Sequence, residues 1–216
     1  MCGRVVLEVL LLSLLVACCG GQFQQQVGGA AGGKVKMEVY FSSLCSDSMR
    51  FFTRQLYPTW QKLSDIIDLE FITYGKARAT PTGTGDYSFE CQHGPDECHG
   101  NKVMACIEQL VPTTTQQVQL LHCMMSKSYP AYSLEPCSKE LGLDWTPIAK
   151  CSGSTQGAGL LYKNGVRTAA LQPRITFIPT ITVNGRYDQF QLRSSLTNLQ
   201  QQVCEAYQGP RHQACI

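Results

Sequence analysis

The chain has 216 residues and is 44% hydrophobic, which suffices for one folded domain, or one domain with an insertion, around a sizeable core. Its 18 lysines and arginines against 16 aspartates and glutamates give a formal net charge of +2, without the basic stripe typical of nucleic-acid binding. We therefore expect no nucleic-acid partner. Hydrolase and kinase motifs are missing too, because Gly83-Thr84-Gly85 lacks the rest of a phosphate-binding loop.

Residues 1–20 predict a signal peptide. Arg4 precedes an apolar run from Val5 to Ala17, and small residues suited to cleavage follow it. A membrane anchor is the alternative, but the run is shorter than the ~20 residues of a spanning helix, and no later segment is long enough. We therefore expect an exported protein with no membrane span in its mature form. Residues 21–34 are rich in Gln and Gly and predict a flexible leader.

Residues 35–216 are expected to form a single domain that opens with a strand, a helix and a second strand. Apolar and polar residues alternate from Val35 to Phe41, as in a strand. From Ser46 to Trp60 the apolar spacing becomes helical, and Pro58 is expected to kink or end this helix. Residues 69–74 predict the second strand. Cys45 therefore stands where the first strand gives way to the helix.

Residues 75–174 carry most of the cysteines and predict a helical insertion, with helical spacing in 103–110, 116–125, 134–141, 145–151 and 157–170. An apolar strand over 175–183 follows, and Asn184-Gly185 is a strong hairpin turn. Residues 189–207 predict one amphipathic helix. Two half-domains around an insertion indicate an α/β protein with a thioredoxin-like fold and a disulfide-braced helical insertion.

Nine cysteines remain after removal of the signal peptide, an odd number, so at least one thiol is free or paired outside the chain. Cys45 is the candidate, because the N–H groups and partial positive charge of a helix N-terminus stabilise a thiolate, the attacking species in thiol-disulfide exchange. An ordinary structural cysteine is the alternative. The other eight are expected to form disulfides, with about 105 possible pairings: Cys91, Cys98, Cys106, Cys123, Cys137, Cys151, Cys204 and Cys215.

The segment Cys91-Gln92-His93-Gly94-Pro95-Asp96-Glu97-Cys98-His99-Gly100-Asn101 closely resembles the CQHGxxECxxN signature of the gamma-interferon-inducible lysosomal thiol reductases. The resemblance extends from Lys36 to Cys215 and includes Pro58-Thr59-Trp60, Val183-Asn184-Gly185 and Tyr207-Gln208-Gly209. Members of this family are thioredoxin-fold enzymes that reduce protein disulfides in the endocytic pathway. The resemblance thus implies disulfide-containing protein substrates and a role in lysosomes, in protein processing and in immune defence.

The same resemblance implies a substrate-binding element. In thioredoxin-like proteins a cis proline before the third core strand faces the active-site cysteine, and Phe177-Ile178-Pro179-Thr180 resembles that element. Ile178 and Pro179 would then hold an extended substrate segment. A trans proline at the start of a strand is the alternative.

One departure from the family pattern concerns the catalytic motif. Family members usually carry Cys-x-x-Cys, whereas this chain has Cys45-Ser46-Asp47-Ser48. Ser48 cannot attack a mixed disulfide, although its hydroxyl could hydrogen-bond the Cys45 sulfur.

Three activities therefore stay open. The favoured one is a monothiol reductase or isomerase in which an external small thiol, glutathione or free cysteine, resolves the mixed disulfide and no cofactor is bound. A binding or regulatory protein that traps partners as mixed disulfides is the second. A catalytically inactive scaffold is the third.

The histidines of the signature invite a metal interpretation. His93 and His99, with Cys91, Cys98 and Cys106, could be read as a zinc site, but export favours disulfides and we expect no metal. His93 is expected either to orient a loop near the thiol or to cap a turn.

The destination of the chain is the secretory pathway, with secretion or the lysosome as end points. The sequence has no Asn-x-Ser/Thr sequon, since Asn101, Asn164, Asn184 and Asn198 lack Ser or Thr at the second following position. This slightly favours secretion over glycan-dependent lysosomal sorting. The sequence does not predict an oligomeric state.

Overall fold

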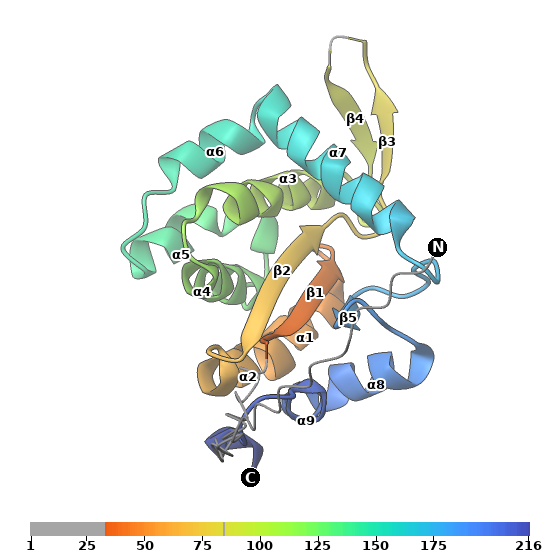
Figure 1. Ribbon diagram of the computed structural model, residues 1–216. Helices are drawn as coiled ribbons and strands as arrows, with labels where there is room; N and C mark the ends of the chain where they lie inside the picture. Colours follow the sequence, from red (N-terminus) through yellow and green to blue (C-terminus); the bar gives the residue numbers. More distant parts are fainter. Residues whose placement is uncertain (1–32, 84) are drawn as a thin grey trace, which may run out of the picture. The chain divides into compact units, whose positions relative to one another are not determined.

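A computed structural model describes residues 33–83 and 85–216; the predicted signal peptide and all but the end of the predicted leader lie outside the described residues (Figure 1). Three strands form the central sheet, in the order β2-β1-β5. β1 (Val35–Phe41) runs parallel to β2 (Ile67–Thr73) and antiparallel to β5 (Thr180–Val183). The predicted strand-helix-strand opening is thus present.

The connection from β1 to β2 is helical throughout. It comprises α1 (Ser46–Phe51), a π-helical turn over Phe52–Leu56 and α2 (Tyr57–Leu63). Pro58 lacks an N–H group, and the wider π-helical turn just before it changes the hydrogen-bond register so that the helical path continues. Pro58 therefore does not end the helical segment.

The segment between β2 and β5 contains more than helices. A hairpin of β3 (Arg78–Pro81) and β4 (Tyr87–Glu90), which was not predicted from the sequence, comes before the predicted helices. Gly83 and Gly85 adopt positive φ angles of 114° and 77°, which glycine allows in a tight turn. The helices that follow are α3 (Pro95–Leu110), α4 (Thr114–Met125), α5 (Leu134–Glu140), α6 (Thr146–Ser152) and α7 (Thr155–Ala170).

The strand of the C-terminal half-domain is shorter than predicted. Of the expected strand over 175–183 only the last four residues, β5, pair with β1. Asn184 and Gly185 form the predicted turn, closed by a hydrogen bond of 2.9 Å from Val183 N–H to the Arg186 carbonyl, but no further strand follows it within residues 85–216. The predicted helix over 189–207 is two helices, α8 (Gln189–Thr197) and α9 (Leu199–Ala206), because Asn198 leaves helical geometry and caps α9.

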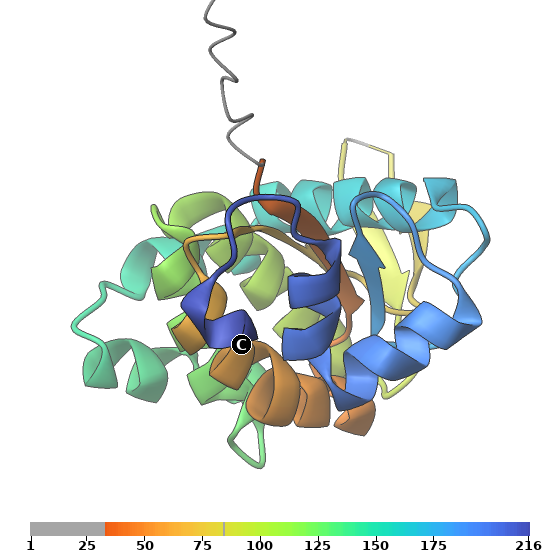
Figure 2. The same cartoon turned by 60° about the horizontal axis from the view of Figure 1, so that its bottom comes forward.

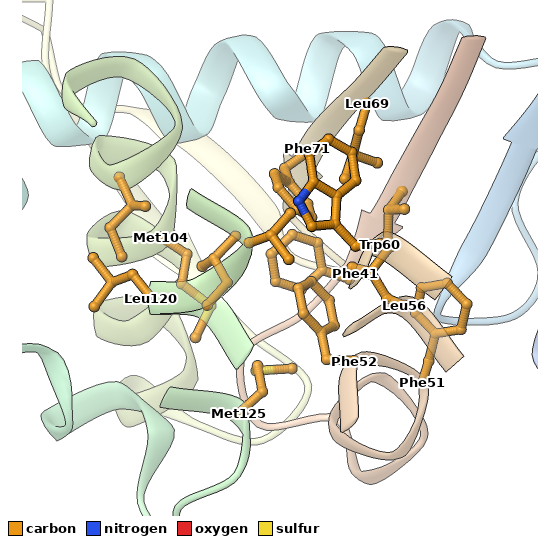
Figure 3. Close-up of a cluster of buried hydrophobic side chains, with 14 of the residues drawn as sticks. Phe41, Phe51, Phe52, Leu56, Trp60, Leu69, Phe71, Met104, Leu120 and Met125 are labelled. Carbon is orange, nitrogen blue, oxygen red and sulfur yellow. The ribbon is translucent and has the colours of Figure 1, made fainter. Parts of the chain in front are cut away.

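The core lies between the sheet and the helices on its two sides. Phe52 stands between Phe41 and Phe71, with ring centroids 4.7 and 5.7 Å away, and Met104 of α3 and Leu120 of α4 close the same cluster (Figure 3). The helices α3 and α7 pack against β2, whereas α8 packs against β5. The helix α9 lies beside α2 (Figure 2). Within the described residues, no helix combines the length and hydropathy needed to cross a bilayer.

Candidate active site around Cys45

Eight cysteines of the described chain form four disulfides, and Cys45 is the one free thiol there. The pairs are Cys91–Cys98, Cys106–Cys151, Cys123–Cys137 and Cys204–Cys215. The first three lie in the segment between β2 and β5, where they join β4 to α3, α3 to α6 and α4 to α5. The cysteines that the zinc interpretation needed are thus bonded to sulfur and are not available as thiolate ligands.

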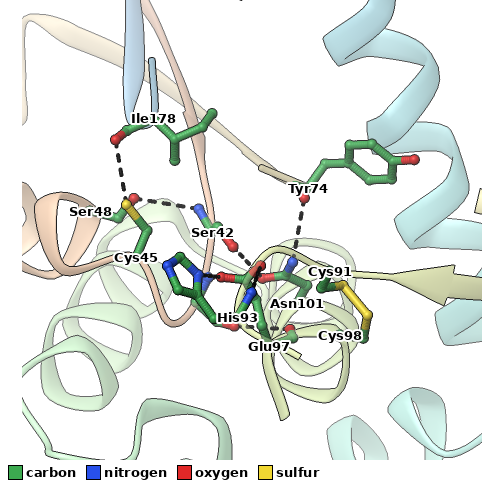
Figure 4. Close-up of polar contacts among 11 residues, drawn as sticks. Ser42, Cys45, Ser48, Tyr74, Cys91, His93, Glu97, Cys98, Asn101 and Ile178 are labelled. Atoms are coloured by element: carbon green, nitrogen blue, oxygen red, sulfur yellow. Dashed lines mark hydrogen bonds and ion pairs between the residues drawn. A yellow bond between two sulfur atoms is a disulfide. The ribbon is translucent and has the colours of Figure 1, made fainter. Parts of the chain in front are cut away.

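Cys45 is the residue that precedes α1. Its backbone is extended, with φ −73° and ψ 117°, and its carbonyl accepts the Met49 N–H at 3.0 Å, which starts the helix. The side chain is partly exposed, and Sγ donates to the Ile178 carbonyl oxygen at 3.4 Å (Figure 4). The first N–H groups of a helix have no partner within the helix, and Cys45 stands at that end of α1.

Ile178 and Pro179 form the other side of the site. Both are buried, the peptide bond between them is cis, and β5 begins at the next residue. The preceding Phe177 is 37% exposed. The chain that faces the Cys45 sulfur therefore passes from an exposed aromatic side chain into the sheet within three residues.

Ser48 is fully buried and does not take the role expected of its hydroxyl. Its Oγ accepts the Ser42 N–H at 3.5 Å, so the hydroxyl ties the loop after β1 to α1. No hydrogen bond joins it to the Cys45 sulfur in this part of the chain. The predicted hydrogen bond from Ser48 to Cys45 is replaced by this loop contact.

The signature segment includes the first turns of α3, and its residues form hydrogen bonds with the same loop after β1. Asn101 is fully buried; its Oδ1 accepts the Ser43 N–H at 2.8 Å and the Ser42 hydroxyl at 3.4 Å, and its Nδ2 donates to the Tyr74 carbonyl at 3.4 Å. The Ser43 hydroxyl donates to the Glu97 carbonyl at 3.1 Å. One helix of the signature thus fixes the two residues that lead toward Cys45 (Figure 4).

Gly100 allows this close approach. A Cβ atom at Gly100 would lie 2.6 Å from the Ser43 Oγ and 3.0 Å from the Ala131 Cβ, closer than side chains tolerate. The positioning role of Ser43, Gly100 and Asn101 was missed from the sequence. The available signal was the spacing of Glu97 and Asn101, four residues apart and hence on one face of a helix.

Comparisons with known proteins agree with this geometry. The sequence profile described as "Gamma interferon inducible lysosomal thiol reductase" matches residues 36–141. The chain is 31% identical to GILT-like protein 1 of Drosophila melanogaster over 230 residues, covering 100% of this chain and 88% of that protein. It is 34% identical to the gamma-interferon-inducible lysosomal thiol reductase of Carassius auratus over 186 residues, covering 84% and 72%.

A solved structure shows the fold. A candidate protein disulfide isomerase from Nitrosomonas europaea matches with a TM-score of 0.50 and 10% sequence identity, covering 77% of this chain and 97% of that one. The predicted α/β class with a thioredoxin-like fold is confirmed.

Proposed function

The chain belongs to the gamma-interferon-inducible lysosomal thiol reductase family, and from this we propose that it is a thiol-disulfide oxidoreductase that reduces or isomerises protein disulfides through Cys45. The observation that carries the proposal is the position of the free thiol. Cys45 stands before α1 with its sulfur 3.4 Å from the Ile178 carbonyl, while the other eight cysteines of the described residues are in disulfides. This contact supports the proposal that Cys45 reacts with a substrate segment held along the backbone of Ile178 and Pro179.

The reaction we propose has two exchanges. The Cys45 thiolate attacks one sulfur of a substrate disulfide, the other substrate sulfur leaves as a thiolate, and a mixed disulfide forms. A small thiol, glutathione or free cysteine, then attacks the substrate sulfur of the mixed disulfide, releases Cys45 as a thiolate and stays bonded to the substrate. A second small thiol removes it as the disulfide of the small thiol. The two external thiols supply both electrons, because Ser48 has no sulfur with which to do so. Ile178 and Pro179 would hold the substrate segment beside the thiol during both steps.

A second candidate function rests on the same serine. Without a second motif cysteine, a mixed disulfide at Cys45 has no internal route to release, so the protein could trap partners and act by binding them. Covalent adducts that persist in non-reducing electrophoresis at physiological concentrations of small thiol would favour this alternative.

We place the protein in the secretory pathway, in the lysosome or outside the cell. The four disulfides and the predicted signal peptide support export. The absence of sequons favours secretion slightly. A part in immune defence or in the processing of proteins for it follows from the family.

The test is reduction of a denatured, disulfide-bonded protein between pH 4.5 and 7, with and without a small thiol. Wild type is compared with Cys45→Ser and Ser48→Cys. We expect turnover that requires the small thiol and is lost in Cys45→Ser. If wild type shows no turnover and Ser48→Cys does, the natural protein is a binding protein on a reductase scaffold. If neither reacts, the scaffold is inactive and the proposal is wrong.

A further inference from the structure

His93 and Glu97 form a pair that the proposed reaction has not yet used. The Glu97 side chain is 0% exposed, and both of its oxygen atoms are occupied by His93: one by the backbone N–H at 3.4 Å, the other by the ring Nδ1. Within residues 33–83 and 85–216, Glu97 forms no ion pair with Lys or Arg. When Nδ1 carries the proton, the ring donates to the buried Glu97 carboxyl group and gives it a side-chain donor. The pair fixes the ring orientation and leaves Nε2 as the nitrogen available for chemistry.

The ring is placed at the site and not deep in the core. The His93 side chain is 40% exposed, and in Figure 4 the ring lies on the Cys45 side of the Glu97 carboxylate. The Glu97 carbonyl accepts the hydroxyl of Ser43, which is two residues before Cys45. The backbone of Glu97, whose side chain holds the His93 ring, is therefore hydrogen-bonded to the loop that leads to Cys45.

Other titratable groups at this end of α3 have partners of their own. The Asp96 carboxylate accepts the Tyr132 hydroxyl at 2.6 Å, and the His99 ring stacks on the Tyr132 ring with centroids 5.2 Å apart. Burial lowers the pKa of His99, with Lys102 adding to the effect and Asp96 opposing it. His93 is thus the histidine of α3's N-terminal end that is both held by a carboxylate and open on its second nitrogen.

We propose that His93, oriented by Glu97, transfers the protons of thiol-disulfide exchange at Cys45. This inference rests on the proposed function and adds a residue to it. In the first exchange, protonated His93 gives its Nε2 proton to the substrate sulfur that leaves, so the product departs as a thiol. In the second, neutral His93 takes the proton of the incoming small thiol as that sulfur attacks the mixed disulfide. The two transfers balance, and Cys45 is released as a thiolate.

The chemistry explains why such a group is useful here. An alkyl thiolate is a poor leaving group, since free cysteine has a pKa of about 8.5, and exchange is faster when the leaving thiol is more acidic. Proton transfer by a positioned side chain contributes about 10²- to 10⁴-fold in enzymes. Both exchanges, the attack on the substrate disulfide and the release of Cys45 by the external thiol that Ser48 makes necessary, involve such a proton transfer.

The test compares two small disulfides whose leaving thiols differ in acidity. Formation of the mixed disulfide at Cys45 is followed by mass spectrometry, with bis(2-hydroxyethyl) disulfide as the alkyl probe and dithiobis(2-nitrobenzoate) as the acidic aryl probe. We expect His93→Gln to slow the alkyl reaction by about 10- to 100-fold. The aryl reaction, whose leaving thiolate needs no proton, should change by less than about threefold. His99→Gln is the matched control and should affect neither rate.

Glu97→Gln keeps the side-chain size and should reproduce the selective loss to a smaller extent, which guards against misfolding of a single variant. Equal slowing of both probes in His93→Gln would mean that His93 only holds the loop, and unchanged rates would mean that it has no role in the exchange. Either result overturns this inference and leaves the proposed function of Cys45 untouched. If wild-type Cys45 reacts with neither probe, the proposed function itself fails.

Discussion

Asn101 is the residue on which the position of the Cys45 loop depends most directly. Its Oδ1 accepts the Ser43 N–H at 2.8 Å, and the residue is fully buried. Asn101→Ala leaves this N–H without its partner and removes one of the two donors to the Tyr74 carbonyl, which should cost about 1–3 kcal/mol of unfolding free energy. Alkylation of Cys45 by iodoacetamide should also change by about two- to tenfold, because the loop that positions the thiol is released. Urea unfolding and alkylation rates measure the two effects.

Asn198→Ala is the control for this prediction. Asn198 is exposed and caps α9 by accepting the Gln201 N–H, so its loss should cost about 1 kcal/mol and leave the alkylation rate unchanged. A stable Asn101→Ala protein with wild-type alkylation kinetics would contradict the positioning role.

Local signals predicted part of the site and tertiary contacts supplied the rest. The odd cysteine count and the change from strand to helix nominated Cys45 from the sequence, because both are local properties. The hydrogen bond between Ser43 and Asn101 joins residues 58 positions apart, and nothing in either neighbourhood indicates the other. The hydrogen bond between Ser48 and Ser42 could not be predicted for the same reason, since only the folded loop brings the two residues together.

At the scale of elements, the approach of α3 to the loop after β1 depends on a helix residue without a side chain. A methyl group at Gly100 would overlap the Ser43 hydroxyl, so Gly100→Ala should destabilise the protein by about 1–3 kcal/mol despite the better helix propensity of alanine. Urea unfolding midpoints provide the measurement.

The matched control is Gly159→Ala in α7. A Cβ there would meet nothing within 4 Å, so the substitution should stabilise by about 0.5–1 kcal/mol through helix propensity alone. If both variants shift the midpoint in the same direction, the contact between α3 and the loop is not tight.

The elements themselves were predicted where hydrophobic periodicity was strong. β1, β2 and most helices follow apolar spacing that one segment contains in itself. The hairpin of β3 and β4 was missed because each strand has only four residues and none of the side chains is buried, so the alternation in Tyr87–Glu90 is too short to stand out. The strand over 175–183 was predicted too long because residues 175–179 do not pair with β1; within them, the Ile178 carbonyl accepts the Cys45 thiol instead.

At the scale of the whole molecule, Glu108 connects three elements through one carboxyl group. It lies on α3, accepts the Thr73 N–H at the end of β2 at 3.1 Å and the Thr73 hydroxyl, and accepts the Asn164 amide of α7 at 2.8 Å. A cavity of about 420 Å³ adjoins it, lined also by Arg167, which pairs with Glu38 at 2.9 Å and Glu70 at 2.5 Å. Burial raises the pKa of Glu108 to about 7, although its hydrogen bonds and Arg167 lower it.

The sign of the resulting pH dependence follows from proton binding. Between the unfolded pKa of 4.5 and about 7, the folded chain keeps a proton on Glu108 that the unfolded chain has released. Folding is therefore favoured at acidic pH, and this contribution is lost as pH rises through that window. A shift of this size corresponds to at most about 3–4 kcal/mol, because one pKa unit is worth about 1.4 kcal/mol.

Glu108→Gln isolates the contribution, since the amide cannot titrate. The difference in unfolding free energy between the variant and wild type should shift by about 1–3 kcal/mol in favour of the variant from pH 4.5 to pH 8. This shift does not depend on which of the two proteins is more stable at pH 4.5. Urea unfolding at steps across this range gives the difference curve. Glu90→Gln, at an exposed position of β4, should give a nearly flat curve. A flat curve for Glu108→Gln as well would show that this carboxyl does not bias the fold toward acidic conditions.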